Sequence, residues 1–296
     1  MKSDRCLISL VLTSCDRIYD LDRFIKSLLL QKIDFNIELI FVNQGTYNPI
    51  DKCSLPSFLH FIIVNVGHPV PLSVARNIGL RHVTGAVIGF PDDDCWYGPA
   101  LLATIQRVFI ELPGTHVVCT NVFDPEKGLS YGGRPLNVRK LVNFSNIFSL
   151  PISVGIFVRR ETFDSVGGKF NESLGAGTFL GSGEETEVIA RLLALGARIL
   201  YAGDISVFHP VPTYIQSDAA KYHAYGLGYG YLSTMLIKQG RFVVVLHWFN
   251  VVVRSLIGML LYVFVSTKRD LYWRRFAGII HGSALAARNI TFSDRL

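Results

Sequence analysis

The stretch Ala86-Val87-Ile88-Gly89-Phe90-Pro91-Asp92-Asp93-Asp94-Cys95-Trp96 joins a short apolar run to three consecutive aspartates. The apolar run is typical of a buried strand, so the aspartates follow the point where that strand ends. Three adjacent carboxylates repel one another and are costly to desolvate unless a cation or solvent neutralises them. Magnesium and similar hard ions bind one or two protein carboxylates together with substrate phosphates. The stretch therefore indicates a metal-bridged phosphate site, and an acidic turn is the alternative, because aspartate tolerates turn geometry.

Strands and helices alternate in the part of the chain around this stretch. The predicted elements are a strand at Cys6–Thr13, a helix at Ile18–Leu29, strands at Glu38–Val42 and Leu59–Val66, a helix at Pro71–Leu80 and the strand at Ala86–Phe90. This order predicts an α/β fold with a largely parallel sheet, whose ligands bind beyond the carboxyl ends of the strands. We therefore expect Ser14–Asp16, Asn43–Thr46 and Asp92–Asp94 to lie on one rim, which favours a binding site over a turn.

The second half of the chain is less regular. It predicts a helix at Gly98–Glu111, strands at Val117–Phe123 and Ser153–Arg159 with a loop at Asp124–Asn137, a helix at Glu184–Leu195, and short strands at Arg198–Tyr201 and Ile205–Phe208. A glycine-rich approach, Gly175–Gly183, leads into Glu184, Glu185 and Glu187. Acidic residues in a first helical turn complement the helix dipole, which explains at least one of these glutamates without any function.

Composition narrows the class of protein. The 296 residues are 50% hydrophobic and 18% charged, so the chain can bury a sizeable core. Its formal net charge is +6, but we find no zinc-finger or RNA-recognition spacing and expect no nucleic-acid partner. The five cysteines are scattered, which favours reduced thiols in a cytosolic compartment. Met1–Arg5 is too short and polar for a secretory signal.

The C-terminal part is apolar and basic. Residues 242–265 are long enough to span a bilayer, but His247, Asn250 and Arg254 interrupt them at helical spacing and form one polar stripe. Residues 270–288 form a second segment that is amphipathic and basic. We expect a helical appendage lying in the interface of an anionic membrane rather than a true span. A helix buried against the rest of the protein or in an oligomer is the alternative.

Five segments in order resemble the family 2 inverting glycosyltransferases, which have the GT-A nucleotide-diphospho-sugar transferase fold. The resemblance runs from about Leu7 to about Tyr231 and is carried by Leu72–Leu80, Gly85–Trp96 with its DXD-type aspartates, Phe157–Gly168, Gly183–Glu187 and His209. It implies a catalytic domain over residues 1–232, with a mostly parallel central sheet and a Rossmann-like N-terminal half. A helical membrane-associating region over residues 233–296 follows.

The resemblance also implies roles on the donor side. Asp92 would contact the nucleoside ribose, and Asp93 would lie near the ribose or the donor sugar. Asp94 would bind a divalent metal, Mn²⁺ or Mg²⁺, which bridges both donor phosphates. Asp16 and Asn43 take positions that often contact the nucleotide.

Four further residues receive roles in the same way. Arg76 either adds charge at the diphosphate or pairs with the aspartates. His209 would be a further metal ligand, although a lone histidine often packs or caps instead. Glu185 matches the catalytic base, which takes the proton of the acceptor hydroxyl, and Glu184 would lie close to the acceptor hydroxyls.

Some positions depart from the family pattern or stay open. Glu185 replaces the usual aspartate and reaches one methylene further. Asn43 replaces an aspartate that often reads the base, so the nucleotide is not identified. Cys95 replaces a commonly acidic residue. Tyr222–Tyr231 fits either a sugar-stacking platform or helix packing by small residues.

We therefore expect a metal-dependent inverting glycosyltransferase that moves a sugar, such as galactose from a UDP-sugar, to a lipid-linked or membrane-borne glycan of bacterial surface polysaccharide, for example lipopolysaccharide. It would work at the cytoplasmic face of the inner membrane as a peripheral or monotopic protein. A homo-oligomer is possible, and the sequence does not identify the oligomeric state. A nucleotidyltransferase of related fold is one alternative, but Ser14–Arg17 lacks the glycine- and basic-rich loop usual there. A catalytically silent nucleotide-sugar-binding protein is another, and intact Asp92, Asp94 and Glu185 argue against it.

Overall fold

The computed structural model describes residues 6–47, 49, 55–211 and 219–288. The chain divides into two compact units: unit 1 contains Met1–Lys169 and Leu192–Val211, and unit 2 contains Phe170–Arg191 and Pro212–Leu296. The predicted domain boundary between residues 232 and 233 falls inside one continuous helix, α6 (Ala219–Lys238). As a functional boundary it stays a prediction.

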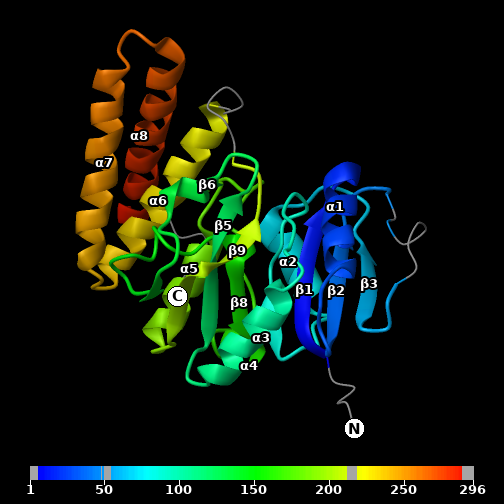
Figure 1. Cartoon of the computed structure of the whole chain (residues 1–296). Helices are drawn as coiled ribbons and strands as arrows, with labels where there is room; N and C mark the ends of the chain where they lie inside the picture. Colours follow the sequence, from blue (N-terminus) through cyan, green and yellow to red (C-terminus); the bar gives the residue numbers. More distant parts are fainter. Residues whose placement is uncertain (1–5, 48, 50–54, 212–218, 289–296) are drawn as a thin grey trace. The chain divides into compact units, whose positions relative to one another are not determined.

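Unit 1 is built on one sheet with the strand order β3-β2-β1-β4-β8-β5-β9-β7, and β6 pairs with β5 (Figure 1). The strands are β1 (Cys6–Ser14), β2 (Asn36–Asn43), β3 (Leu59–Asn65), β4 (Val87–Gly89), β5 (Val117–Asp124), β6 (Leu129–Ser130), β7 (Arg139–Leu141), β8 (Ile156–Arg159) and β9 (Ile199–Phe208). The first four are parallel, as predicted. Their order reverses between β1 and β4, and such a reversal opens a ligand crevice beyond the carboxyl ends of the strands.

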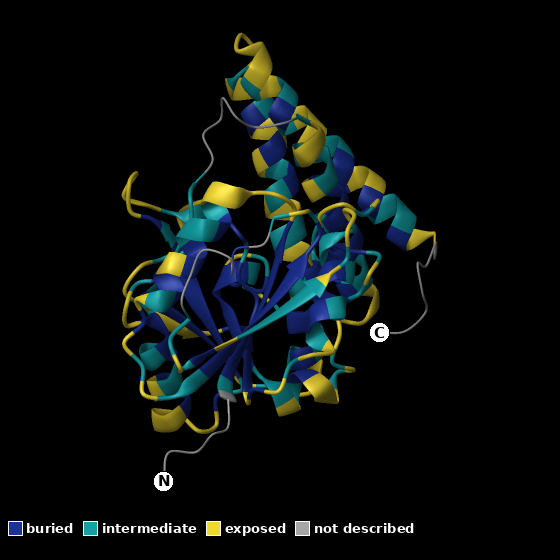
Figure 2. Cartoon of the chain, turned by 90° about the vertical axis from the view of Figure 1, so that its right-hand side faces the viewer, coloured by how far each residue is buried: buried dark blue, intermediate teal, exposed yellow. Residues whose placement is uncertain are grey.

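Helices cover both faces of this sheet. They are α1 (Ile18–Leu29), α2 (Leu72–Leu80), α3 (Leu101–Glu111) and α4 (Arg160–Ser165). Because strand side chains alternate between faces, Leu10 joins the cluster that contains Phe24 of α1 and Leu102 of α3, whereas Val11 faces α2. A methyl group on Gly79 of α2 would lie 2.6 Å from Val11 Cγ1, so glycine permits this close approach. Figure 2 shows the resulting buried sheet in dark blue.

The second half of the sheet is mixed and differs in detail from the prediction. β8 is antiparallel to both β4 and β5, and it begins only after a 3₁₀ turn, η3 (Ser153–Gly155). The predicted loop at Asp124–Asn137 contains β6 and η2 (Tyr131–Gly133). The two short strands expected at Arg198–Phe208 are one strand, β9, because its pairing with β5 skips Gly203–Ile205 as a bulge and then resumes.

A buried carboxylate positions the start of β4. Glu38 of β2 is only 3% exposed and accepts hydrogen bonds from Ser9 Oγ, from Thr84 N at 2.6 Å and Oγ1 at 2.8 Å, and from Gly85 N at 3.2 Å. Thr84 and Gly85 form the loop that leads from α2 into β4. Glu38 therefore fixes the loop that delivers the acidic stretch to the rim.

We predict that Glu38→Ala lowers the free energy of unfolding by about 3 kcal/mol, because it removes the acceptor that buried Ser9 and Gly85 share with the loop residue Thr84. Urea denaturation followed by circular dichroism measures this change. Glu126→Ala, at an exposed loop glutamate, is the matched control and should change stability by less than about 0.5 kcal/mol. Equal effects of the two substitutions would contradict the role given to Glu38.

Unit 2 is helical. It contains most of α5 (Glu184–Ala194), together with α6, α7 (Val243–Leu261) and α8 (Ser266–Ala287). A Cβ atom on Gly226, Gly230 or Gly282 would overlap the backbone of the facing helix in the α6–α8 pair. The small residues of Tyr222–Tyr231 thus serve helix packing, one of the two interpretations that the sequence left open.

Candidate functional site

The polar ends of β1, β2 and β4 meet on one rim, as the sequence predicts. Ser14 Oγ donates to Asp93 Oδ2 at 2.6 Å, which joins the end of β1 to the residues after β4. Asp16 Oδ1 accepts hydrogen bonds from the backbone of Thr46 at 2.8 Å and of Tyr47 at 3.1 Å, which joins β1 to the loop after β2. The rim lies at the point where the strand order reverses.

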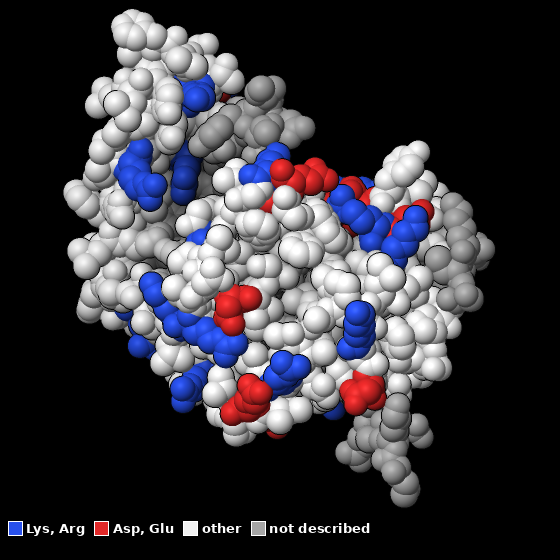
Figure 3. Space-filling view, viewed as in Figure 1, with Lys and Arg blue, Asp and Glu red and all other residues white. Residues whose placement is uncertain are grey.

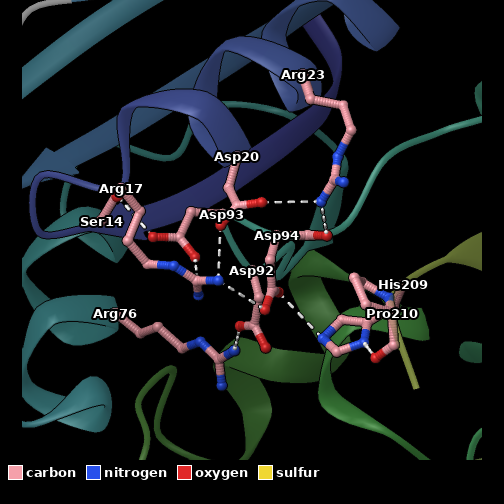
Figure 4. A network of polar contacts seen from close by, with 10 residues as sticks. All are labelled: Ser14, Arg17, Asp20, Arg23, Arg76, Asp92, Asp93, Asp94, His209 and Pro210. Carbon is pink, nitrogen blue, oxygen red and sulfur yellow. Dashed lines mark hydrogen bonds and ion pairs between the residues drawn. The ribbon is translucent and has the colours of Figure 1, made fainter. Parts of the chain in front are cut away.

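Three metal-ligating side chains gather on this rim. Ligand atoms of Asp92, Asp94 and His209 all lie within 4.8 Å of one another, and His209 Nε2 is 3.0 Å from Asp94 Oδ1 (Figure 4). His209 follows β9 directly, and its backbone N–H donates to Phe123 O at 3.0 Å. Two carboxylates and one imidazole form a donor set that fits a divalent cation, with room in its coordination shell for phosphate oxygens.

The imidazole of His209 is oriented by its surroundings. Nδ1 lies 2.7 Å from Pro210 O, and the ring meets Tyr131 edge-on with centroids 5.6 Å apart. Donation by Nδ1–H to this carbonyl directs Nε2 toward Asp94, as is usual for a metal-ligating histidine. Burial lowers the pKa of His209, but the contact with Asp94 outweighs burial and the net shift is upward. The upward shift favours the protonated form of His209 beside Asp94.

Each aspartate of the acidic stretch has its own compensating group. Arg76 of α2 is completely buried, and its Nη2 donates to Asp92 Oδ1 at 2.9 Å. Burial raises the pKa of Asp93 to about 6, although Ser14 and Arg17 favour its ionised form. Burial also opposes ionisation of Asp94, but the hydrogen bond from His209 and the nearby positive charges lower its pKa to about 2.

Two arginines of the site were missed at the sequence level. Arg17 Nη1 is 2.8 Å from Asp93 Oδ1, and its Nη2 is 3.1 Å from Asp94 Oδ2. Arg23 Nη2 donates to the backbone carbonyl of Asp94 at 2.7 Å, and its guanidinium lies 4.3 Å from the centre of the Trp96 ring. Asp20 bridges both arginines (Figure 4). The available signal was the spacing of Arg17, Asp20 and Arg23, which places all three on the first turns of one helix.

Asp16 and Asn43, predicted on the donor side, have contacts that shape the loops. Asp16 has a positive φ of 54° and holds the turn after β2. Asn43 is 5% exposed; it donates to Tyr47 O and Asn65 Oδ1 and accepts from Gly45 N. Any contact with a nucleotide would come in addition to these bonds, and the donor role of both residues stays a prediction.

The glutamates of α5 differ from one another within unit 2. Glu187 is 2% exposed and forms an ion pair with Arg191 at 2.8 Å, so its role is structural. Glu184 is buried against Gly175, whose φ of 101° and missing side chain make room for it. Glu185 is half-buried and forms no hydrogen bond or ion pair with the residues that the structure describes. A glycine is thus needed at position 175 of the segment before α5 because Glu184 occupies the space of its side chain. The Glu185 carboxylate stays available for binding or catalysis.

Comparison with known proteins decides the family. A family model described as Glycosyl transferase family 2 matches residues 9–164, slightly more than half of the chain. The chain belongs to glycosyl transferase family 2. The match covers β1 to α4, including the acidic stretch and Arg17. No protein among the curated sequences matches this chain.

Solved structures show the same GT-A fold as this family 2 chain. The S. aureus TarS 1–349 structure has a TM-score of 0.57 at 15% sequence identity, with 75% of this chain and 65% of that chain covered. A mannosyltransferase from Pyrobaculum calidifontis, PcManGT, has a TM-score of 0.65 at 13% identity, with 94% and 87% covered. The chain thus spans 65% of TarS 1–349, and 43% of a longer TarS structure. TarS was solved with UDP-GlcNAc and PcManGT with GDP-Man and Mn²⁺.

We predict that Arg17→Gln tightens Mn²⁺ binding in the absence of a donor about two- to fivefold, because the guanidinium competes for Asp94 Oδ2 and a half-exposed ion pair is worth up to about 1 kcal/mol. Electron paramagnetic resonance of free Mn²⁺ measures the dissociation constant. Arg23→Gln is the matched control, since Arg23 touches Asp94 at its backbone carbonyl and not at its carboxylate. Weaker Mn²⁺ binding in Arg17→Gln would show that Arg17 supports the metal instead of competing with it.

Proposed function

We propose that this chain is a metal-dependent enzyme that transfers a sugar from a nucleotide-sugar to a glycan hydroxyl, with inversion at the anomeric carbon. One observation carries the proposal: a cluster of two carboxylates and one imidazole lies on the carboxyl-end rim of a family 2 chain. Two proteins of similar fold were solved with nucleotide-sugars, one with UDP-GlcNAc and one with GDP-Man. This supports a nucleotide-sugar donor, and the two examples differ in the nucleotide.

On the donor side, the metal would be held by Asp92, Asp94 and His209. When bound, it supplies a Lewis acid for the growing negative charge of the leaving diphosphate. The mixed oxygen and nitrogen donor set favours Mn²⁺, because imidazole is a poorer ligand for Mg²⁺. Arg76 holds one oxygen of Asp92, so the other would serve both the metal and a ribose hydroxyl, while Ser14 and Arg17 hold Asp93 in place.

On the acceptor side, Glu185 is proposed as the general base. Its carboxylate takes the proton of the acceptor hydroxyl while that oxygen bonds to the anomeric carbon. The bond between the anomeric carbon and the diphosphate breaks on the opposite side, and the nucleoside diphosphate leaves with the electron pair. Among the residues that the structure describes, Glu185 has no hydrogen-bond or ion-pair partner, which supports this role because a base must be free to accept a proton. Glu184 is proposed to line the acceptor site.

The proposal also names substrates, which the site residues alone do not identify. We propose a UDP-sugar such as UDP-galactose as donor and a lipid-linked or membrane-borne glycan as acceptor, in bacterial surface polysaccharide synthesis such as that of lipopolysaccharide. The enzyme would act at the cytoplasmic face of the inner membrane. The support for a membrane-borne acceptor is the apolar and basic C-terminal part of the chain.

Two substitutions separate the donor and acceptor halves of the mechanism. Asp94→Asn should abolish the metal-dependent rise in melting temperature that the donor causes, and with it sugar transfer. Glu185→Gln should keep that rise but lower the transfer rate about 100-fold or more, because general base catalysis contributes at least that factor. Thermal shift and nucleoside diphosphate release measure the two effects.

Matched controls are Asp34→Asn and Glu161→Gln, at exposed positions in unit 1, and both should behave like the original chain. The proposed function is wrong if transfer survives both Asp94→Asn and Glu185→Gln. Donor binding without turnover on any glycan acceptor would favour a silent nucleotide-sugar-binding protein.

The nucleotide can be identified with a panel of UDP- and GDP-sugars, each tested with and without Mn²⁺. Ligand binding raises apparent stability by mass action, so the true donor should give the largest metal-dependent rise in melting temperature. We expect UDP-sugars to give this rise. A rise with GDP-sugars alone would overturn the assignment of UDP, and equal rises without Mn²⁺ would overturn metal dependence.

A further inference from the structure

Helices α7 and α8 form an antiparallel hairpin whose turn lies at residues 262–265. Trp248 Nε1 of α7 donates to Ser283 Oγ of α8 at 3.0 Å, far from the turn. Close to the turn, the rings of Tyr262 and Tyr272 stack with centroids 5.8 Å apart. Residue numbers therefore rise along α7 while those of the contacting residues fall along α8, so α8 returns alongside α7 in the antiparallel direction.

Helix α7 and the residues that flank it expose a row of large apolar side chains. We call this row the hairpin stripe, and its members with their exposed fractions are Phe242 (71%), Leu246 (73%), Phe249 (60%), Leu260 (74%) and Phe264 (98%). The spacing of the first four by three, four or eleven residues keeps them on one side of α7, and Phe264 lies in the turn after it. Only 17% of the most apolar 18-residue window of α7 is buried. A single exposed leucine is ordinary, but a continuous apolar row marks an interaction surface.

Positive charge accompanies the hairpin stripe. Between residues 238 and 288 the sequence holds eight lysines and arginines but only one acidic residue, Asp270. Arg254, Arg269 and Arg274 are exposed, and Figure 3 shows basic side chains on the otherwise uncharged surface of the hairpin. Trp273 of α8 is 52% exposed, and tryptophan is enriched where membrane meets water. Exposed apolar and cationic groups on the same pair of helices complement the acyl chains and phosphates of an anionic bilayer.

The hairpin arrangement argues against a true membrane span. Val243–Leu261 has the length and composition of a spanning helix. However, if α7 crossed a bilayer, α8 would have to return beside it and carry Arg269, Asp270 and Arg274 through or across the membrane. Intramembrane charges are costly. Lying in the interface places the same charges among the lipid headgroups.

We propose that the α7–α8 hairpin is a monotopic docking surface for an anionic lipid bilayer. The hairpin stripe lies at the level of the upper acyl chains, and Arg254, Arg269 and Arg274 contact lipid phosphates. Where it concerns the acceptor, this inference rests on the proposed function, since it gives the membrane that carries a lipid-linked glycan. The docking itself is inferred from the exposed apolar and basic side chains of α7 and α8 and does not depend on the proposed function.

Flotation of the full chain with lipid vesicles tests the proposal. The chain should float with vesicles of phosphatidylcholine and phosphatidylglycerol but not with phosphatidylcholine alone, and alkaline carbonate should release it. The triple variant Leu246→Gln/Phe249→Gln/Leu260→Gln should lower partitioning at least about tenfold, because inserted apolar area drives binding. Arg269→Gln/Arg274→Gln should lower it at low salt and make it less sensitive to added salt.

The matched control is Leu30→Gln/Ile110→Gln/Leu195→Gln, which changes equally exposed apolar side chains outside the hairpin and should float like the original chain. Flotation that survives the hairpin triple variant would overturn the proposal. Retention after carbonate would show a span instead. A dimer that the triple variant dissociates, with no vesicle binding by the original chain, would make the hairpin stripe a subunit interface.

Donor-dependent thermal shift on the same proteins keeps the two proposals apart. The hairpin triple variant should keep the shift with its donor and Mn²⁺, since the donor-binding residues are unchanged. If the original chain floats but shows no donor-dependent shift, the docking surface is supported and the proposed function is contradicted. If it shows the shift but does not float, the proposed function is supported and the docking surface is contradicted.

Discussion

The need to neutralise three consecutive carboxylates after β4 ties several elements of unit 1 together. Asp92 pairs with a buried arginine of α2, Asp93 with Arg17 at the start of α1, and Asp94 with both Arg17 and His209 at the end of β9. Several secondary-structure elements thus meet at one cluster of charge. Asp93 is buried, and Asp92 and Asp94 are partly buried, so leaving these carboxylates unpaired would destabilise the arrangement of the elements that carry their partners.

The sheet makes these pairings geometrically available. The strand order 3-2-1-4 brings the end of β1 beside the end of β4, and the parallel pairing of β5 with β9 carries His209 to the same rim. Close packing of α2 at Gly79 supports the helix whose Arg76 reaches Asp92. In unit 2, glycines likewise permit close packing, because they let the backbones of α6 and α8 come into contact. Helix α7 keeps an exposed apolar face.

Much of the fold could be predicted because its signals are local. The apolar runs and helical periodicity of the first ninety residues predicted β1, α1, β2, β3, α2 and β4 closely, and the polar strand ends predicted the rim. The second half was harder, since β9 looked like two strands and η3 like part of β8. There, pairing with β5 and β7 holds together a bulged strand whose glycine and aspartate would suggest a break. Asp92, Asp94 and His209 were named as candidates from family resemblance, and the structure brings them together.

Residues close together in the chain carry the order of the elements, the place of the acidic stretch at a strand end, and the apolar and basic character of the C-terminal helices, so these features could be read without a structure. The pairing of the charges, in contrast, depends on how the elements pack in three dimensions. Arg17 and Asp93 are 76 residues apart and Arg17 and Asp94 are 77 apart, so no local pattern relates them. The tertiary structure also decided that α8 returns beside α7, since that depends on which faces of two helices pack and not on the hydropathy of either.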